Sequence, residues 1–269
     1  MTTRLTFLGV AGYDVQGPDH RILIDPCLRA NPAAPCGPDD VATPDVILVS
    51  HAAFDHLGDT AAIARRTGAP VVCGGDVRLL LLEQGLPSEQ VRATVWGIVV
   101  EVGGVLVRPV ECHHWSQGVL AGGQPVSGVP LGFIVETEPG VVIYHYGDTA
   151  IFGDLRLIGE LYRPTVGLLG CAQPRAFADA VPGPGRLVTG EMSPREAALA
   201  AEMLGVRLAV ACHYLEASCP EVAEFLALVH EYDTTGTRAA VALEPGQALV
   251  VDGAAHHVVD GGIARREGT

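Results

Sequence analysis

Short apolar runs rich in β-branched residues alternate along this chain with longer stretches in which apolar positions recur every three or four residues. The short runs predict strands, and the longer stretches predict amphipathic helices. Gly, Pro and Asp stand at most of the joints between them, where turns are expected. The expected strands cover residues 5–9, 21–25, 46–50, 70–74, 99–112, 131–136, 141–147, 166–171, 208–213 and 248–253.

The helix predicted most firmly covers residues 193–205. Ser193 can cap its first turn, Pro194 fits the first helical position, Glu196 completes a capping box, and Gly205 supplies a stop. Three further helices are expected from glycine stops or a proline start together with an apolar stripe, over residues 57–68, 76–85 and 220–232.

The order of the elements predicts two similar α/β halves packed together in one domain spanning residues 1–269. Strands and helices come first, then a long antiparallel-looking stretch, then strands and helices again. Neither a sequence repeat nor a linker separates the halves. The most irregular segment is 172–191, whose Pro-Gly-Pro-Gly run fits neither a helix nor a central strand. A loop of this length beside a strand end is expected to be functional.

Composition narrows the classes of function. The net charge is −14, and all 17 basic residues are arginines scattered along the chain, which argues against a nucleic-acid partner. The seven cysteines are an odd number without CxxC spacing, which is typical of a reducing cytoplasm. No secretion signal is visible, and no apolar run approaches the roughly 20 residues of a membrane span. We therefore expect a cytoplasmic protein.

Four groups of His and Asp residues follow predicted apolar strands. A single histidine after a strand is more often structural than catalytic, but four such groups suggest one shared site. His and Asp are the donors that suit zinc, manganese or iron. The groups are His51, Asp55 and His56; His113 and His114; Asp148; and His213.

Taken together, these motifs resemble the metallo-β-lactamase superfamily. The matching stretches are SHAAFDHLGD, ECHHWS, YGDT, EMSPREAALAAEMLG and ACHY, preceded by FLGVAGYDV and RILIDPCL. They are most similar to the branch of L-ascorbate-6-phosphate lactonase-like hydrolases and N-acyl-phosphatidylethanolamine phospholipase D. The resemblance implies an α/β fold, a four-layer αββα sandwich, with a hydrolytic metal site at one edge between its two sheets.

The resemblance also implies a ligand set. His51 and His114 would belong to a first metal position, Asp55, His56 and His213 to a second, and Asp148 would bridge them. The family's HxHxDH motif reads HAAFDH here, so Ala53 replaces one ligand of the first position. His113 or His145 could replace that ligand, although adjacent residues on a strand point to opposite faces.

We therefore expect a metal-dependent hydrolase with one metal ion, most simply zinc, in the second position, while manganese or iron also fits the donors. Asp55 would orient the attacking water or take its proton, and His51 would act as an acid or base. The substrate would be a small ester, lactone, amide or phosphodiester. The alternatives are a non-hydrolytic metalloenzyme, using iron or catalysing a cyclisation, and a metal-poor binding protein. A homo-oligomer stays open.

Other residues near these motifs have two interpretations. Cys112 and Cys212 stand beside proposed ligands, but free cysteines are commonly small buried apolar residues. Trp115 could line a substrate pocket or pack in the core. Substrate-binding groups could include Tyr214, Gln173 and Arg175, and the arginine is suited to a carboxylate or phosphate.

Overall fold

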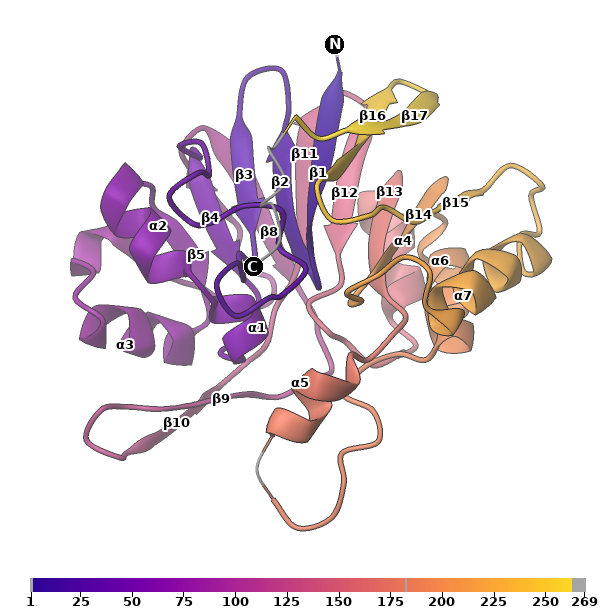
Figure 1. Ribbon diagram of the computed structural model, residues 1–269. Helices are drawn as coiled ribbons and strands as arrows, with labels where there is room; N and C mark the ends of the chain where they lie inside the picture. Colours follow the sequence, from indigo (N-terminus) through magenta and orange to yellow (C-terminus); the bar gives the residue numbers. More distant parts are fainter. Residues whose placement is uncertain (1, 182, 263–269) are drawn as a thin grey trace.

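The computed structural model describes residues 2–181 and 183–262, and its centre consists of two stacked β-sheets (Figure 1). One sheet has eight strands in the order β17 (Ala255–Asp260), β16 (Gln247–Asp252), β1 (Thr3–Gly9), β2 (Gly12–Gln16), β3 (Arg21–Ile24), β4 (Val46–Val49), β5 (Val71–Cys73) and β6 (Val91–Ala93). The other has seven, in the order β15 (Ala239–Val241), β14 (Leu208–Cys212), β13 (Val166–Gly170), β12 (Val141–His145), β11 (Gly132–Glu138), β8 (Val105–Val110) and β7 (Val100–Val102).

Helices cover the outer face of each sheet. The eight-stranded sheet carries α2 (Thr60–Thr67) and α3 (Gly75–Glu83), and the seven-stranded sheet carries α4 (Leu155–Tyr162), α6 (Pro194–Leu204) and α7 (Pro220–Glu231). Shorter helical segments are α1 (Phe54–Leu57), α5 (Arg175–Ala180) and the 3-10 turn η1 (Ser88–Gln90). The order helix, sheet, sheet, helix is the four-layer sandwich that the sequence predicted.

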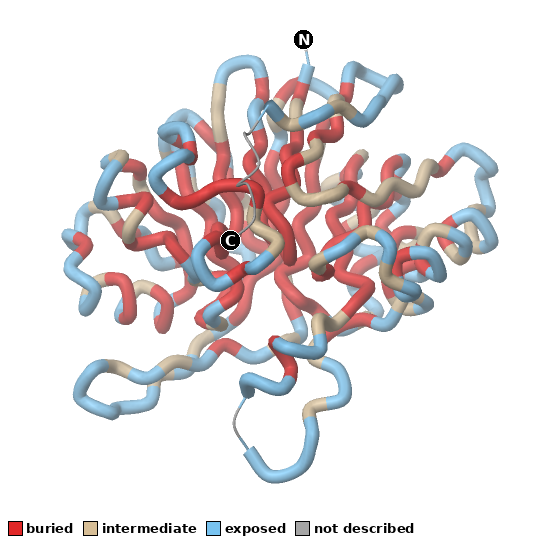
Figure 2. The backbone as a smooth tube through the Cα atoms, in the orientation of Figure 1, coloured by how far each residue is buried: buried red, intermediate tan, exposed pale blue. Residues whose placement is uncertain are grey.

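Strand β4 shows why its sequence is apolar at every position. Val46 and Leu48 belong to the core between the two sheets, whereas Ile47 and Val49 belong to a second core under α2 and α3. Because alternate side chains of a strand point to opposite faces, a strand covered on both faces needs apolar residues throughout. The buried strands and exposed outer loops are visible in Figure 2.

The directions of the strands bring several strand ends to one edge of the sandwich. β3 and β4 pair in parallel, as do β12, β13 and β14, and β8 runs in the same direction as β12 because both are antiparallel to β11. The residues that follow these strands therefore meet at the same edge. A small antiparallel hairpin, β9 (Ser116–Val119) and β10 (Pro125–Gly128), projects from this edge, as α5 does (Figure 1).

The predicted helix 193–205 is confirmed as α6. Ser193 accepts from the Glu196 backbone N–H, Glu196 accepts from the Ser193 N–H, and Gly205 closes the helix in the left-handed conformation. The helix predicted over 57–68 begins later, at Thr60, because Phe54–Leu57 forms a separate turn closed by Gly58.

Two other sequence predictions were wrong in detail. The stretch 99–112 is two strands, β7 and β8, joined at Gly103 and Gly104, which both have positive φ angles. The irregular segment 172–191 contains a short helix, α5, before its Pro-Gly run. None of the helices within the described ranges has the length and apolar character needed to cross a membrane.

We predict that Leu48→Ala lowers the free energy of unfolding by about 2–5 kcal/mol, because Leu48 is fully buried between the sheets. Leu106→Ala is the matched control: Leu106 is 53% exposed on β8, so its substitution should change stability by about 0.5 kcal/mol or less. Urea unfolding of the three proteins measures both effects, and equal losses in the two variants would contradict the assignment of the core.

Candidate metal centre

Each candidate ligand is fixed by the end of a strand or by the turn after it. His51 lies two residues after β4, Asp148 three residues after β12, and His213 directly after β14. The helical turn α1 follows His51 and carries Asp55 and His56 on consecutive positions. The candidate ligands thus lie within a few residues of strand ends, so the rigid strands fix their positions.

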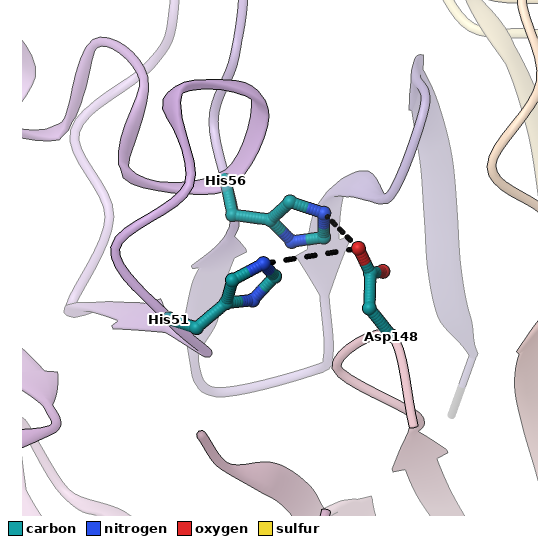
Figure 3. Close-up of side chains that lie close together, drawn as sticks. All are labelled: His51, His56 and Asp148. Carbon is teal, nitrogen blue, oxygen red and sulfur yellow. Dashed lines mark ion pairs between the residues drawn. The ribbon is translucent and has the colours of Figure 1, made fainter. Parts of the chain in front are cut away.

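Asp148 lies at the centre of the group. Its Oδ2 atom is 2.9 Å from His56 Nε2, 3.3 Å from His213 Nε2 and 3.8 Å from His51 Nε2. Figure 3 shows His51 and His56 pointing at this oxygen from the same side. One carboxylate oxygen is therefore the common neighbour of three imidazole nitrogens.

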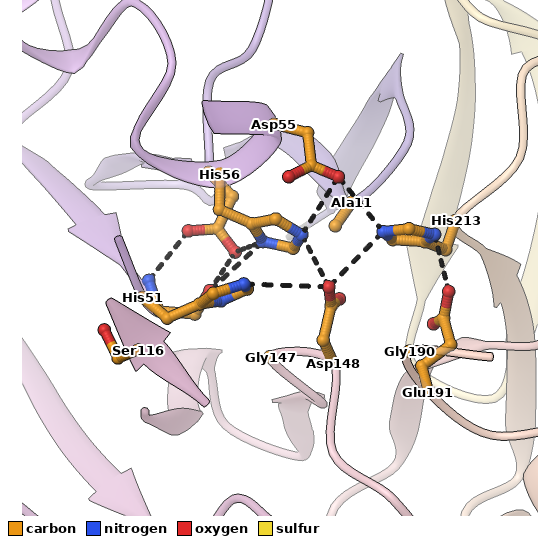
Figure 4. Close-up of polar contacts among 12 residues, drawn as sticks. Ala11, His51, Asp55, His56, Ser116, Gly147, Asp148, Gly190, Glu191 and His213 are labelled. Atoms are coloured by element: carbon orange, nitrogen blue, oxygen red, sulfur yellow. Dashed lines mark hydrogen bonds and ion pairs between the residues drawn. The ribbon is translucent and has the colours of Figure 1, made fainter. Parts of the chain in front are cut away.

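Asp55 completes the half of the group nearest His213. Its Oδ2 atom lies 3.5 Å from His213 Nε2 and 4.0 Å from His56 Nε2 (Figure 4). Two ligands of a tetrahedral zinc ion with bonds of about 2.0–2.1 Å are themselves about 3.3 Å apart. The Asp148 and Asp55 oxygens lie 2.9–4.0 Å from the two imidazole nitrogens, which is around this value. Asp55, His56 and His213 form one close group of donors, and Asp148 lies beside both imidazoles.

The donor atoms also lack other partners. His51 Nε2, His56 Nε2, His213 Nε2 and Asp148 Oδ1 are buried and form no hydrogen bond with any residue in the described part of the chain. Buried polar atoms are rarely left unpaired, because each costs about 1–3 kcal/mol. A cation among them would satisfy the imidazole lone pairs, so the residues present fit a metal ion.

Asp25 and Ser50 set the orientation of two of these rings. Asp25 Oδ2 is 2.8 Å from His56 Nδ1 and accepts from the Ser50 hydroxyl at 2.7 Å, and Asp25 Oδ1 accepts from the Ser50 N–H. Since the Ser50 hydroxyl donates to Asp25, it accepts from His51 Nδ1 at 2.9 Å. Both rings therefore carry a proton on Nδ1 and present Nε2 to Asp148, the arrangement that orients metal-binding histidines.

Glu191 does the same for His213. Its Oε1 atom lies 2.5 Å from His213 Nδ1, which is also 3.1 Å from the Ala172 carbonyl oxygen, and its Oε2 accepts from the Tyr146 hydroxyl at 2.7 Å. Glu191 is buried two residues before Ser193, the N-cap of α6. Asp25, Ser50, Tyr146 and Glu191 were not among the residues predicted from the sequence. For Glu191 the only sequence signal is an acidic residue beside a capping box, which by itself predicts nothing.

The pKa values follow from burial and this packing of opposite charges. Burial lowers the pKa of His56, but the carboxylates of Asp148 and Asp25 outweigh burial and raise it well above its usual value. Burial raises the pKa of Glu191 to about 7, although His213 acts in the opposite direction. Burial, and then repulsion by His56, lower the pKa of His51 to about 3, far below the near-neutral value that suits the predicted acid or base role.

His114 lies apart from the close groups of donors. Within the described residues, groups of three or more donor atoms include His51, His56 and Asp148, and Asp55, His56 and His213, but His114 belongs to none of them. Its ring lies edge-on to His51, with centroids 4.8 Å apart, at the wall of the cavity over the site.

Neither proposed substitute for the missing ligand joins the group. His113 is half exposed, stacks on Phe152 and lies 2.7 Å from Glu111 through Nε2. His145 is buried and donates from Nε2 to the Ala11 carbonyl oxygen at 2.9 Å. Both side chains are thus committed elsewhere.

The backbone at this edge is strained. Asp25, Asp148 and His213 have φ angles of 43°, 68° and 66°, and Val10 has 57°. Such values cost a non-glycine residue about 1–3 kcal/mol and cluster at functional sites. Val10 accepts from the His213 N–H at 2.7 Å, so its strained turn fixes the backbone of a candidate ligand.

The residues predicted to bind substrate are only partly found at the cavity. Trp115 and Gln173 line the cavity over the metal centre. Tyr214 is instead buried and donates to the Leu243 carbonyl oxygen, and Arg175 pairs with Asp179 and donates to Leu187 O. The expected substrate-binding roles of Tyr214 and Arg175 are therefore not supported.

Cys112 and Cys212 are buried, and burial raises the pKa of both thiols, which disfavours a reactive thiolate. They are small buried residues, as the sequence analysis favoured.

A sandwich of two sheets with buried His and Asp donors gathered at one edge defines a class of metal-binding α/β proteins. The chain belongs to the metallo-β-lactamase superfamily, because residues 20–214 match the family described as "Beta-lactamase superfamily domain". This match contains every candidate ligand named above.

Relatives and solved structures agree with this assignment. The chain is 42% identical to a "UPF0173 metal-dependent hydrolase" of Rubrobacter xylanophilus over 79% of this chain and 81% of that protein. It is similar to Igni18, described as a metallo hydrolase of Ignicoccus hospitalis, with a TM-score of 0.72 and 25% identity over 94% of this chain and 99% of that one. The diiron β-hydroxylase CmlA of Streptomyces venezuelae shares only the fold, with a TM-score of 0.65 and 14% identity over 93% of this chain and 54% of CmlA.

We predict that Glu191→Gln weakens metal binding by about 10–100-fold, the usual cost of removing a carboxylate that orients a metal-binding histidine. Isothermal titration of metal-free protein with zinc measures the effect. Glu224→Gln, an exposed change on α7, is the control and should leave the affinity unchanged. Equal affinities for wild type and Glu191→Gln would contradict the orienting role.

Proposed function

We propose that this chain, a metal-dependent hydrolase of the metallo-β-lactamase superfamily, holds one divalent metal ion among Asp55, His56, Asp148 and His213. The observation that carries the proposal is the approach of the unpaired Nε2 atoms of His56 and His213 to one oxygen of Asp148, at 2.9 and 3.3 Å. Zinc is the ion we propose first, and manganese or iron suits the same donors.

An ion at this place would supply Lewis acidity, polarising a carbonyl or phosphoryl oxygen and lowering the pKa of a water molecule to about 7. Asp55 is the donor farthest from its neighbours, and its side chain also lines the cavity. Its carboxylate is therefore the group best placed to orient the attacking water and to take its proton.

His51 contributes a neutral imidazole at the cavity wall. Its Nδ1 proton is held by Ser50, and its Nε2 faces Asp148 and the cavity without a hydrogen bond in the described chain. Because its pKa is about 3, His51 is better suited to accept a hydrogen bond from the water or the substrate than to act as an acid. This modifies the acid or base role that the sequence suggested.

The presence of alanine at position 53 is an argument for one metal ion instead of two. Its methyl group lines the cavity where the family motif has a third histidine, and it cannot donate to a metal. His51 and Asp148 remain on that side, but His114 is outside the close donor groups of the described chain. A second ion would thus have too few ligands for firm binding.

The proposed reaction is hydrolysis of a small ester, lactone, amide or phosphodiester, in the manner of the lactonase-like branch that the motifs resemble. The proposed compartment is the cytoplasm, and the buried thiols of Cys112, Cys171 and Cys212, which form no disulfide bonds, are consistent with it.

We predict that protein purified without added metal contains about one ion per chain, measured by mass spectrometry of the metal content. Ala53→His restores the missing donor and should raise the content to about two in the presence of excess zinc. Two ions per wild-type chain would contradict the single-ion proposal, and none, even after zinc is added, would contradict the metal centre itself.

We predict that His51→Ala keeps one metal ion and lowers kcat by about 10–100-fold, the effect of losing one hydrogen bond worth 1.4–2.8 kcal/mol in the transition state. His56→Ala should instead lose both the ion and turnover, because His56 is a proposed ligand. Metal content and kcat of the two variants are compared, and full turnover in His51→Ala would show that its imidazole plays no part.

A further inference from the structure

We infer that the substrate is a neutral acyl compound, an ester, lactone or amide with an apolar acyl group, and not a phosphodiester or another anion. This inference rests on the proposed function, because it assigns the cavity to the substrate of the metal centre at its floor. The inference reduces the four proposed classes of substrate to three, the ester, the lactone and the amide, which share an uncharged carbonyl group.

The cavity has the size of a small-molecule site. Its volume is about 920 Å³, and its floor consists of His51, Asp55, Asp148 and His213. One wall is the β9–β10 hairpin, and the other consists of residues from 173–181 and 187–190, in and around α5. Both segments project from the same end of the sandwich (Figure 1). Sites of this volume enclose most of a ligand of drug size.

Both walls are joined to the metal loop, so the cavity is formed before a substrate arrives. Ser116, the first residue of β9, accepts from the Ala52 N–H at 3.0 Å, directly beside His51. The Phe54 ring, next to Asp55, meets the Phe177 ring of α5 edge-on, with centroids 5.3 Å apart. Because the cavity is preformed, the residues that line it indicate which kind of ligand it binds.

The walls are mostly apolar and partly exposed. Phe54 and Trp115 are 44% and 45% exposed, and Val119 is 65% exposed. Large apolar side chains gathered at a cavity indicate a site that binds an apolar group. The apolar side chains of the walls are Trp115, Val119, Val126, Phe177, Val181 and Leu187.

The charges of the lining disfavour an anion. Among the described residues, no arginine lines the cavity, and Arg175, near its rim, is paired with Asp179. A divalent ion at the floor would be balanced by the carboxylates of Asp55 and Asp148. A phosphate or carboxylate group would therefore lack the bidentate arginine that usually recognises it, and it would face two buried carboxylates.

Neutral polar groups remain for recognition of the substrate. Gln117, Ser127, Gln173 and Thr189 line the cavity. The amide groups of Gln117 and Gln173 can donate a hydrogen bond to a carbonyl or ether oxygen, whereas the hydroxyls of Ser127 and Thr189 already donate to the Ser116 and Glu191 carbonyl oxygens and can only accept. Gln173 accepts from the Gly190 N–H at 2.9 Å through its oxygen, so its NH₂ group is the part left to donate. This set suits an uncharged ester or amide.

The first test measures binding to metal-free protein, where only the chain's own residues act. Hexanamide and hexanoate have the same chain and differ in charge, and calorimetry should show hexanamide binding at least about tenfold more tightly. Leu187→Arg places a cation in the wall and should reverse this preference. Val188→Arg is the matched control, because Val188 is 71% exposed and is not a lining residue, and the preference should persist.

The second test measures hydrolysis by the metal-loaded protein. We expect kcat/KM for p-nitrophenyl hexanoate to exceed that for the acetate by about tenfold or more, since a methylene group in an apolar pocket can change kcat/KM by about 10–200-fold. Bis(p-nitrophenyl) phosphate should be a poorer substrate than either ester. Phe177→Ala should reduce the advantage of the hexanoate without changing the metal content.

The outcomes separate this inference from the proposed function. Preferred hydrolysis of the phosphodiester, or equal binding of hexanoate and hexanamide, overturns the inference and leaves the hydrolase intact. Tight binding of hexanamide that Leu187→Arg abolishes, with no hydrolysis of any of the three compounds by metal-loaded protein, supports the apolar neutral site and overturns the proposed hydrolase.

Discussion

The contacts of His56 with two buried carboxylates join the two halves of this fold. Asp25 follows β3 of the eight-stranded sheet, Asp148 follows β12 of the seven-stranded sheet, and the His56 ring lies 2.8 and 2.9 Å from them. An unpaired charge in such a place costs several kcal/mol. The requirement to pair these groups therefore constrains the spacing of the sheets, the turn before α1 and the strained backbone of Asp25 and Asp148.

Local patterns in the sequence predicted the strands, the helices and the two α/β halves, whereas the four layers and the edge that carries the site were implied by the resemblance of the motifs to the superfamily. Four consecutive apolar residues in β4 show that both of its faces are covered, and His51 follows directly on that pattern. The sequence could not predict the partners of those histidines. Glu191 precedes α6 and His213 follows β14, 22 residues later in the chain, and only the packing of α6 against the seven-stranded sheet brings them together.

The positions of the surrounding atoms show which part of the site Ala53 affects. Its effect is confined to the side of Asp148 where His51 and His114 lie, whereas the other side has two imidazoles whose Nδ1 atoms are held by Asp25 and Glu191. A carboxylate behind an imidazole makes the opposite nitrogen a better donor. In the proposed centre, the half with its full set of candidate ligands is thus also the half in which carboxylates support the imidazoles, and Ala53 removes no donor from that half.

The hairpin β9–β10 and the segment around α5 form the walls of the cavity and lie at the margins of the two cores. Val126 of β10 packs against the core under α2 and α3. Phe177 and Ala178 are buried, yet neither belongs to the two clusters of core residues. We therefore expect changes in the segment around α5 to cost less folding free energy than changes in the strands that hold the candidate ligands. In the proposed enzyme, the strand ends would perform the chemistry and the two walls would select the substrate. New specificities can arise in it, by natural divergence or in the laboratory, by exchanging two surface segments on an unchanged reaction centre.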